Sequence, residues 1–161
     1  MKLDYRIGFG YDVHQFADDR KFILGGIEIP FERGLKGHSD ADALLHSICD
    51  AILGALALGD IGKHFPDSDP QYKGIASSLL LSKVNNFAES EGYKLGNLDS
   101  TIVLQRPKLA PYIESIRKNI ASILFCDVEH ISVKATTSEW MGFVGEEKGI
   151  KVISTVIMVK K

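Results

Sequence analysis

Ile7-Gly8-Phe9-Gly10-Tyr11-Asp12-Val13-His14, close to the start of the chain, is the stretch that says most about its architecture. Its aromatic and β-branched residues predict a β-strand. Because alternate residues of a strand point to the same face, Asp12 and His14 are expected to lie side by side. A carboxylate and an imidazole are common metal ligands, but an Asp-x-His pattern also arises often by chance. A metal site therefore needs a further ligand from another part of the chain.

The helix predicted next along the chain offers this ligand. Ser39 and Asp42 have the spacing of a capping box, and apolar residues then recur with a helical period to about residue 58. Asp42, His46 and Asp50 are spaced i, i+4, i+8, so they form a polar line beside the apolar face. Either this line is a solvated edge, or His46 is a metal ligand whose second ring nitrogen is bound by a neighbouring carboxylate. Asp12, His14 and His46 together would leave one tetrahedral position open, as in catalytic zinc sites.

The rest of the sequence predicts loosely alternating strands and helices. Gly25-Gly26 lies between two short apolar runs, which predicts a tight hairpin. The apolar patterns predict helices over residues 77–91 and 112–124 and strands over residues 94–104, 131–135 and 150–159. The polar segment 60–74 contains aromatic and apolar residues, which favours an ordered functional loop. We therefore expect an α+β fold, a two-layer sandwich of a mixed β-sheet and helices, in one domain spanning residues 1–161.

The composition excludes several classes of protein. The formal net charge is −2 and the basic residues are scattered, so neither a nucleic-acid nor a membrane partner is expected. Residues 1–5 lack the apolar core of a signal peptide. Cys49 and Cys126 have no paired spacing and are expected to be reduced thiols. These features predict a cytoplasmic protein, and the family resemblance given below would place it in a bacterium, or in a plastid if a transit peptide was removed.

Three further segments carry groups that suit phosphates. His38 and Ser39 precede the predicted helix, where backbone N–H groups favour an anion, although Ser39 can simply be the N-cap. The segment 105–111 places two cations and two prolines before a helix, which suits a nucleotide or an ordinary exposed connection. The segment 134–139 ends a strand with three hydroxyls and a carboxylate, which suit phosphate oxygens and Mg²⁺ or Mn²⁺, or else a helix cap.

Four conspicuous side chains receive no functional role at this point. His64 and His130 lie in polar segments, where solvation is expected. Trp140 and Phe143 are expected to be packing residues. The sequence contains no Walker A, H-E-x-x-H, G-x-S-x-G or dinucleotide-binding motif, so none of those chemistries is indicated.

Taken together, these segments resemble the 2-C-methyl-D-erythritol 2,4-cyclodiphosphate synthase family of the non-mevalonate isoprenoid pathway. The matching stretches follow the order of the family across almost the whole chain. They are Gly10–His14, Gly37–Asp42 with Leu45-His46, Leu58–Pro70, Gly96–Asp99, Gln105–Lys108, and Lys134–Glu139 followed by Gly142-Phe143. Each stretch is modestly specific, but the set is very specific.

The resemblance implies a reaction and an assembly. It implies conversion of 4-diphosphocytidyl-2-C-methyl-D-erythritol 2-phosphate to the cyclodiphosphate with release of CMP, by attack of the 2-phosphate on the β-phosphorus. No protein nucleophile is needed, so positioning and charge stabilisation carry the catalysis. The partner is thus a small cytidine diphosphate substrate. A homotrimer with active sites at the subunit interfaces is also implied.

The resemblance further implies roles for individual residues. Asp12, His14 and His46 would bind Zn²⁺, one ion per active site, and Glu139 would bind Mg²⁺ or Mn²⁺ together with the substrate diphosphate. His38 and Thr137 would stabilise the transition state. The residues expected to contact the substrate are Asp12, His14, His38, Ser39, Asp60, Ile61, Gly62, Phe65, Asp67, Asp69, Leu104, Gln105, Arg106, Pro107, Lys108, Leu109, Ala110, Thr136, Thr137, Ser138, Glu139 and Phe143.

One departure from the family pattern concerns a cavity on the threefold axis. Glu146 and Lys148 stand where members often have an arginine and a glutamate. In the family this region faces a cavity reported to hold an isoprenoid diphosphate. Because the charges are exchanged here, we expect such a ligand to bind weakly or not at all.

Two other functions compete with the cyclisation. One is a zinc-dependent phosphohydrolase that uses the same ligands and a water nucleophile. The other is a metal-stabilised binding or oligomerisation module without catalysis. Thr137 and Glu139 argue against the module, because a structural zinc site has no use for them. The segment that begins at Gln105 argues for a nucleotide-bearing substrate over a simple phosphoester.

Overall fold

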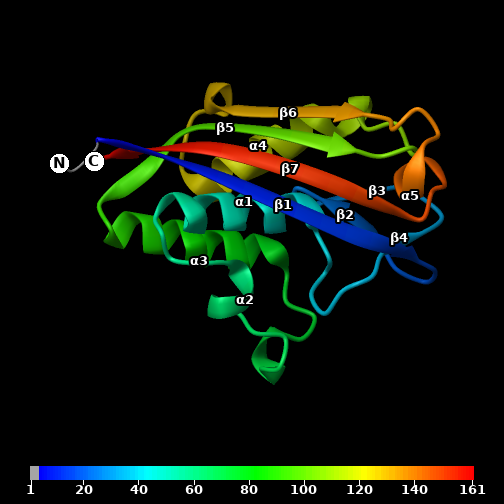
Figure 1. Cartoon of the computed structure of the whole chain (residues 1–161), viewed down its shortest axis with the longest axis horizontal. Helices are drawn as coiled ribbons and strands as arrows, with labels where there is room; N and C mark the ends of the chain where they lie inside the picture. The colour runs from blue at the N-terminus through cyan, green and yellow to red at the C-terminus, as the bar shows by residue number, and fades with distance from the viewer. Residues whose placement is uncertain (1–3) are drawn as a thin grey trace.

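A five-stranded sheet forms one layer of the molecule, and helices cover one of its faces (Figure 1). The computed structural model describes residues 4–161, so residues 1–3, on which part of the signal-peptide argument rests, lie outside it. The strand order is β4-β1-β7-β5-β6. The strands are β1 (Tyr5–Ala17), β4 (Gly34–Leu35), β5 (Tyr93–Val103), β6 (Ile131–Thr136) and β7 (Gly149–Lys160). Because β5 and β6 are parallel and the other neighbours antiparallel, the predicted mixed sheet and α+β class are confirmed.

The helices pack their apolar faces against this sheet and enclose the main core. The three longer helices are α1 (Ala43–Ala55), α3 (Ser77–Ser90) and α4 (Ile113–Leu124). Shorter ones are α2 (Ile61–His64), α5 (Gly142–Gly145) and the 3₁₀ turns Pro70–Tyr72, Ala110–Tyr112 and Val128–His130. Fully buried leucine and isoleucine side chains of α1 share one core with buried residues of β5 and β7. No helix within residues 4–161 is long and apolar enough to cross a membrane.

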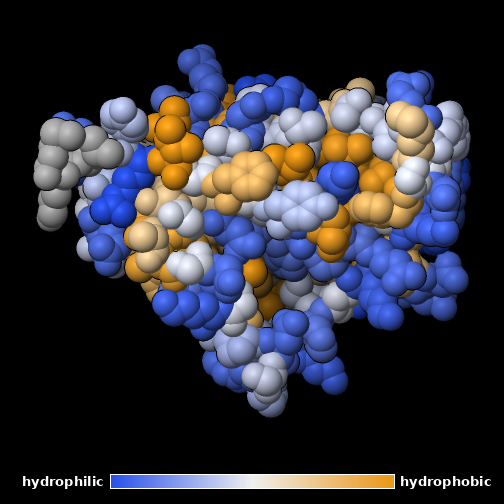
Figure 2. All heavy atoms as spheres, viewed as in Figure 1, coloured by the Kyte–Doolittle hydropathy of each residue, from blue (hydrophilic) through white to orange (hydrophobic). Residues whose placement is uncertain are grey.

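The two faces of β1 are used in an unusual way. Its inward face carries glycines, and a Cβ at Gly8 or Gly10 would lie 1.7 Å from the carbonyl oxygen of Ala51 or 1.8 Å from that of Ser47. The backbone of α1 therefore rests directly on β1. The outward face carries Tyr5, Ile7, Phe9, Tyr11 and Val13, which are between 42% and 64% exposed. Figure 2 shows hydrophobic residues gathered along the path that β1 and β7 follow in Figure 1.

The start of α1 differs from the capping-box prediction. The N-cap is Asp42 and not Ser39, so the helix begins at Ala43, and it ends at Ala55 instead of near residue 58. The Asp42 carboxylate accepts hydrogen bonds from the N–H groups of Leu45 (3.0 Å), Gly25 (3.0 Å) and Gly26 (2.6 Å). An ionisable carboxylate binds orphan N–H groups more strongly than a hydroxyl does, which explains why Asp42 takes the cap.

The predicted hairpin is confirmed, and its turn has a second role. Strands β2 (Phe22–Leu24) and β3 (Ile27–Ile29) flank Gly25 and Gly26, whose φ angles are 60° and 74°. Positive φ at both positions matches a turn type that glycine adopts without strain. The N–H groups of this turn bind the Asp42 carboxylate, so the turn holds the start of α1.

Several local expectations are corrected or confirmed. Cys49 and Cys126 are both free, as expected. His64 and His130 are not merely solvated, because their ring nitrogens lie 3.0 Å and 2.6 Å from backbone carbonyl oxygens. Trp140 does not pack in the core but is 67% exposed. Its backbone has a positive φ in a turn that displays the ring on the surface.

Candidate functional site

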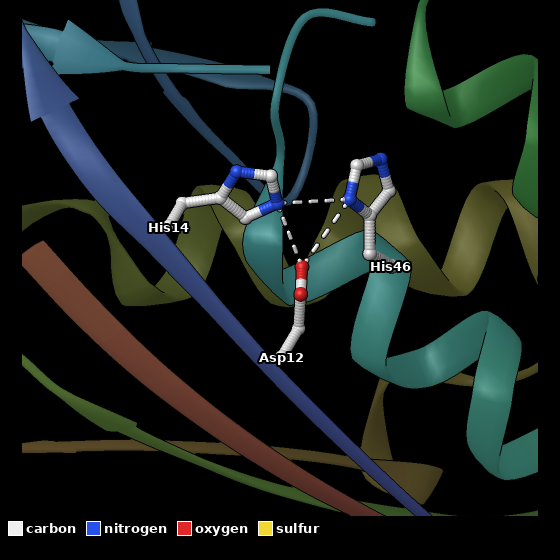
Figure 3. A group of neighbouring side chains, drawn as sticks. All are labelled: Asp12, His14 and His46. Carbon is white, nitrogen blue, oxygen red and sulfur yellow. Dashed lines mark hydrogen bonds and ion pairs between the residues drawn. The ribbon is translucent and has the colours of Figure 1, made fainter. Parts of the chain in front are cut away.

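Asp12, His14 and His46 converge on one point (Figure 3). The Asp12 Oδ2 atom lies 2.9 Å from His14 Nε2 and 3.2 Å from His46 Nδ1, and the two ring nitrogens are 3.2 Å apart. Asp12 and His14 come from β1, as their alternation predicted, and His46 comes from α1. The close contact of α1 with Gly10 brings these two elements near enough for the three side chains to meet.

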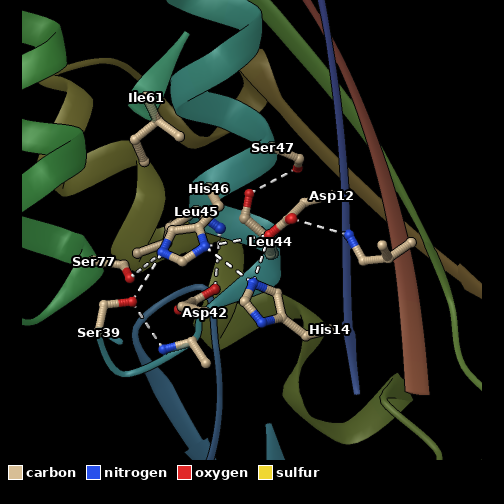
Figure 4. Close-up of polar contacts among 12 residues, drawn as sticks. Asp12, His14, Ser39, Asp42, Leu44, Leu45, His46, Ser47, Ile61 and Ser77 are labelled. Atoms are coloured by element: carbon tan, nitrogen blue, oxygen red, sulfur yellow. Dashed lines mark hydrogen bonds and ion pairs between the residues drawn. The ribbon is translucent and has the colours of Figure 1, made fainter. Parts of the chain in front are cut away.

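Hydrogen bonds on the far side of each histidine ring determine which ring nitrogen carries a hydrogen and which one presents a lone pair to the cluster. His14 Nδ1 lies 2.7 Å from the carbonyl oxygen of Lys36, so this nitrogen carries the hydrogen and Nε2 carries the lone pair. His46 Nε2 lies 2.9 Å from the Ser77 hydroxyl and 3.2 Å from the Ser39 hydroxyl, which leaves Nδ1 free to present a lone pair (Figure 4). Two lone pairs and a carboxylate thus face one another.

Such a donor set fits a divalent cation. Three acceptors that face one another repel unless a proton or a metal ion lies between them. One carboxylate oxygen and two imidazole nitrogens are typical zinc ligands, and three protein ligands leave a fourth position for another group. The residues present therefore fit the zinc ion that the family resemblance implies.

The pKa values of the cluster indicate which protons compete with a cation. Burial alone would raise the pKa of Asp12, but the hydrogen bonds and charges that the His14 and His46 rings supply when a proton lies on the facing nitrogen outweigh it, and the net pKa is lowered. For His14 burial alone would lower the pKa, but the hydrogen bond and charge of Asp12 raise it overall. Asp12 is thus ionised, and a proton on His14 is the main competitor of a metal ion at acidic pH.

The three residues of the predicted polar line on α1 have three different roles. Asp42 caps the helix, His46 points to Asp12, and Asp50 accepts a 2.7 Å hydrogen bond from the N–H of Ile61. Burial raises the pKa of both carboxyls, that of Asp42 to about 6. The expected carboxylate on the second ring nitrogen of His46 is replaced by the hydroxyls of Ser39 and Ser77.

A pocket of about 310 Å³ opens beside the three ligands. Besides Asp12, His14 and His46, its lining includes the predicted residues His38, Ser39, Ile61, Gly62, Phe65 and Asp67. His38 Nε2 lies 3.9 Å from a carboxylate oxygen of Asp67, and both side chains are exposed. Tyr72 and Lys73 also line the pocket and were not predicted, because nothing in their local sequence distinguishes them from an ordinary loop. We call this space the ligand pocket.

A second pocket of about 460 Å³ lies at the ends of β5 and β6. It gathers the predicted residues Leu104, Gln105, Pro107, Lys108, Leu109, Ala110, Thr136 and Thr137. We call it the loop pocket. It shares no lining residue with the ligand pocket, so one chain does not bring His38 and Thr137 into a common cavity.

The remaining predicted residues lie elsewhere. Asp60 caps α2 by accepting from the N–H of Lys63, and Asp69 caps the following 3₁₀ turn. Ser138 donates to the carbonyl oxygen of Met141 at 2.8 Å, which holds the turn that contains Glu139. These are local structural contacts, and none of them opposes a contact with a substrate.

Two further residues belong to an ion-pair cluster or to the outer face of the sheet. Arg106 turns away from the loop pocket and pairs with Glu147 and Glu32, at 2.7 Å and 3.0 Å. Phe143 lines a shallow apolar pocket with Tyr11 and Val13.

Comparisons with known proteins identify the relatives of this fold and site. The model of the YgbB family matches residues 5–159. A 2-C-methyl-D-erythritol 2,4-cyclodiphosphate synthase of Clostridioides difficile is 58% identical over 154 residues, which is 96% of each chain. The IspF of Plasmodium falciparum in a CDP complex superimposes with a TM-score of 0.87 and 34% identity, covering 99% of each chain. The bifunctional IspDF of Campylobacter jejuni gives a TM-score of 0.95 at 41% identity, with 99% of this chain covering 43% of that one.

Proposed function

The chain belongs to the YgbB family and has the activity for which its relatives are named, and we propose which of its residues perform each part of that reaction. The activity is the conversion of 4-diphosphocytidyl-2-C-methyl-D-erythritol 2-phosphate to 2-C-methyl-D-erythritol 2,4-cyclodiphosphate and CMP. An oxygen of the 2-phosphate forms a bond to the β-phosphorus. The bond from this phosphorus to the bridging oxygen breaks, and its electron pair leaves with CMP. The observation that carries our assignment is the Asp12, His14 and His46 cluster in the lining of the ligand pocket.

We assign the phosphate and methylerythritol end of the substrate to the ligand pocket. The Ser39 hydroxyl oxygen accepts from the backbone N–H of Ala41 at 3.1 Å and lies 3.2 Å from the ring nitrogen Nε2 of His46, which carries a hydrogen. Because both contacts use the lone pairs of the oxygen, the hydroxyl hydrogen of Ser39 remains available for a phosphate oxygen. His38 is exposed at the rim, where it can donate to the transferring phosphate. Ile61, Gly62, Phe65 and Asp67 line the wall expected to contact the methylerythritol.

The cytidine end is assigned to the loop pocket. Backbone groups of Leu104 to Ala110 offer hydrogen bonds to a base edge, and Lys108 offers a positive charge near a phosphate. Thr136 and Thr137 are exposed and line the same pocket, where a hydroxyl can donate to the negative charge that develops on the phosphoryl oxygens. The substrate is bent when both ends are bound, and this proximity favours ring closure.

We propose that the two pockets of one active site come from neighbouring subunits of a homotrimer. The argument is that His38 and Thr137 line separate pockets of one chain, whereas one reaction needs both. The outward face of β1 supplies a surface for the assembly, because five exposed hydrophobic side chains follow one another along it. A cyclic arrangement buries this face and places each ligand pocket next to a neighbour's loop pocket.

Two cations complete the proposed site. Zinc bound by Asp12, His14 and His46 would polarise a phosphate oxygen as a Lewis acid. Glu139 offers one exposed carboxylate for Mg²⁺ or Mn²⁺, which binds through one or two carboxylates when phosphates supply the other oxygens. The task of the chain is to present these carboxylates and imidazoles in the correct ionisation and orientation.

Three broader assignments go with this function. The family match from residue 5 to residue 159 supports one domain over the whole chain. The free Cys49 and Cys126 and the bacterial relatives support a cytoplasmic location. The pairing of Lys148 with Glu146 in this structure supports the expected weak binding of isoprenoid diphosphates, because a diphosphate at Lys148 would meet the negative charge of Glu146.

A phosphorus NMR experiment tests the reaction against the phosphohydrolase alternative, which the comparisons do not favour. The protein is incubated with the substrate, Zn²⁺ and Mg²⁺, and the phosphorus spectrum is followed. We expect the two coupled resonances of a cyclic diphosphate together with CMP. Linear phosphates would instead indicate hydrolysis, and an unchanged spectrum would indicate a module without catalysis.

A further inference from the structure

The second ring nitrogen of His46 is bound by a chain of polar groups that continues into another helix. His46 Nε2 lies 2.9 Å from the hydroxyl of Ser77, the first residue of α3. The Ser77 hydroxyl in turn donates to Asp40, whose other carboxylate oxygen accepts the N–H of Ser77 at 3.1 Å. Ser77 is completely buried, so solvent does not replace either contact. Figure 4 shows the Ser77 hydroxyl directed at the His46 ring from the side opposite Asp12.

The direction of these hydrogen bonds follows from their chemistry. An ionised carboxylate only accepts, so the single hydroxyl hydrogen of Ser77 is committed to Asp40. The Ser77 oxygen can then only accept from His46, which places the ring hydrogen on Nε2. The lone pair of the ring is therefore on Nδ1, the atom that faces Asp12 and His14.

We propose that Ser77 and Asp40 are positioning residues for the metal: they hold His46 in the one tautomer and ring orientation that binds zinc through Nδ1. The inference rests on the proposed zinc site and extends it to two residues outside the ligand set. Histidine ligands in proteins generally donate their second N–H to a fixed acceptor, and loss of that acceptor weakens metal binding. Here the acceptor is a hydroxyl that a carboxylate polarises from behind.

The arrangement also explains why Ser77 is not an ordinary helix cap. Residue 76, an alanine, is the N-cap of α3 and makes no side-chain cap hydrogen bond. Instead, the Asp40 carboxylate binds the first turn of α3 through both the N–H and the hydroxyl of Ser77. This contact also ties the segment before α1, which carries His38 and Ser39, to the helix behind the site. Loss of the Ser77 hydroxyl would therefore leave His46 Nε2 with only its longer 3.2 Å contact to the Ser39 hydroxyl, without removing a metal ligand.

The test measures zinc affinity by competition with a chromophoric chelator, using the full chain. We expect Ser77→Ala to weaken zinc binding by about 10- to 100-fold. Ser77→Thr keeps a hydroxyl and should restore most of the affinity. Asp40→Asn should weaken binding less than Ser77→Ala does, because an amide oxygen can still accept from Ser77.

Ser47→Ala is the matched control. Ser47 lies on the same helix as His46, is completely buried, and makes hydroxyl hydrogen bonds to Leu44 and Ser154. Its loss should lower the thermal stability as much as the loss of Ser77 does but leave the zinc affinity unchanged. A Ser77→Ala variant that binds zinc as tightly as wild type would overturn the proposal.

Nitrogen NMR of the histidine rings supplies an independent readout. In the metal-free wild type we expect the Nε2–H tautomer of His46, and in Ser77→Ala a mixture of tautomers. A His46 ring that keeps one tautomer without the hydroxyl would contradict the mechanism. Because neither measurement uses the substrate, failure of the proposed reaction would leave both results interpretable.

Discussion

Asp42 shows how one side chain can serve the fold and the site at once. Its carboxylate accepts from the first turn of α1 and from both glycines of the β2–β3 turn, and it has no exposed surface. The N–H donors and the helix dipole favour the ionised form, whereas burial favours the protonated form. Burial is the larger of the two effects, which raises the pKa of Asp42 to about 6.

This pKa predicts a dependence of stability on pH. The folded pKa of about 6 lies above the usual value of 3.8, so the folded state holds the proton more tightly between these pH values. The contribution of Asp42 is therefore largest below about pH 4 and is lost as the pH rises through 6, a change of about 3 kcal/mol. The measurement is the free energy of unfolding of the metal-free wild type minus that of Asp42→Asn, from pH 4 to pH 7 at one protein concentration. A difference that does not vary with pH would show that the N–H donors keep Asp42 ionised in the folded state.

His46 is the ligand whose loss should separate metal binding from assembly. We expect His46→Ala to lose zinc and activity, because two of three protein ligands do not hold the ion. The oligomer should persist, since the His46 side chain is only 14% exposed and does not lie on the outward face of β1. Metal analysis, activity and light scattering measure the three properties. His130→Ala removes a histidine from the other end of the sheet and should bind zinc normally, whereas wild-type turnover by a metal-free His46→Ala would refute the assignment.

At the scale of elements, the contact between β1 and α1 positions the site. Because Gly8 and Gly10 have no side chains, the backbone of α1 can pack directly on the backbone of β1. This contact sets the distance from His46 on α1 to Asp12 and His14 on β1. Strand β1 therefore carries ligands and glycines on its inward face and hydrophobic residues on its outward face. A second contact between elements involves Arg106, which ties the segment that follows β5 to the turn that precedes β7.

A methyl group at Gly10 should damage the fold and the site together. The Cβ of Gly10→Ala would lie 1.8 Å from a backbone carbonyl oxygen, which cannot rotate away, so α1 must shift. We expect a loss of at least about 3 kcal/mol in the free energy of unfolding and weaker zinc binding. Gly54→Ala on α1 is the control, because its Cβ would meet only the carbonyl oxygen of Phe9 at 3.9 Å. This variant should be stabilised by up to about 1 kcal/mol with unchanged zinc affinity, and chemical denaturation checks both values.

The ion pairs of Arg106 should affect substrate binding more than turnover. Arg106 binds both carboxylate oxygens of Glu147, at 2.7 Å and 3.1 Å, and this contact holds the segment that lines the loop pocket. We expect Glu147→Gln to raise the KM by about two- to fivefold with little change in kcat, because Arg106 is half exposed and keeps its pair with Glu32. The matched control is Glu28→Gln, which removes a similar exposed pair with Lys21 far from either pocket. A changed kcat with an unchanged KM would contradict this role.

At the scale of the whole molecule, the ligand pocket and the loop pocket are separate, and this separation gives the sharpest test of the proposed trimer. His38→Ala and Thr137→Ala should each be nearly inactive. Co-expressed in equal amounts, the two chains form mixed trimers about three quarters of the time, and each mixed trimer contains one intact site. About one quarter of the wild-type activity should therefore return. If each chain held a complete site, the mixture would be as inactive as the separate variants.

Local sequence patterns account for most of the elements and for part of the site. Alternation along β1 placed Asp12 and His14 on one face, and the helical period placed His46 beside the apolar face of α1, because these periods are properties of the backbone within a few residues. The Gly25-Gly26 turn followed from glycine's tolerance of positive φ. The roles of Ser39 and Asp42 at the helix start were wrong, because the Asp42 cap depends on a turn that is 16 residues away.

The resemblance between motifs, and not their spacing, indicated the substrate and the metal. Only the tertiary structure showed the contact of α1 with Gly8 and Gly10, the Ser77 and Asp40 hydrogen bonds behind His46, and the separation of the ligand pocket from the loop pocket. Each of these depends on residues that are distant along the chain and adjacent in space. Their contacts form when the whole core packs, and packing between distant segments leaves no periodic pattern in the local sequence. A sequence pattern can therefore indicate a ligand, but it cannot indicate the groups that hold this ligand in place.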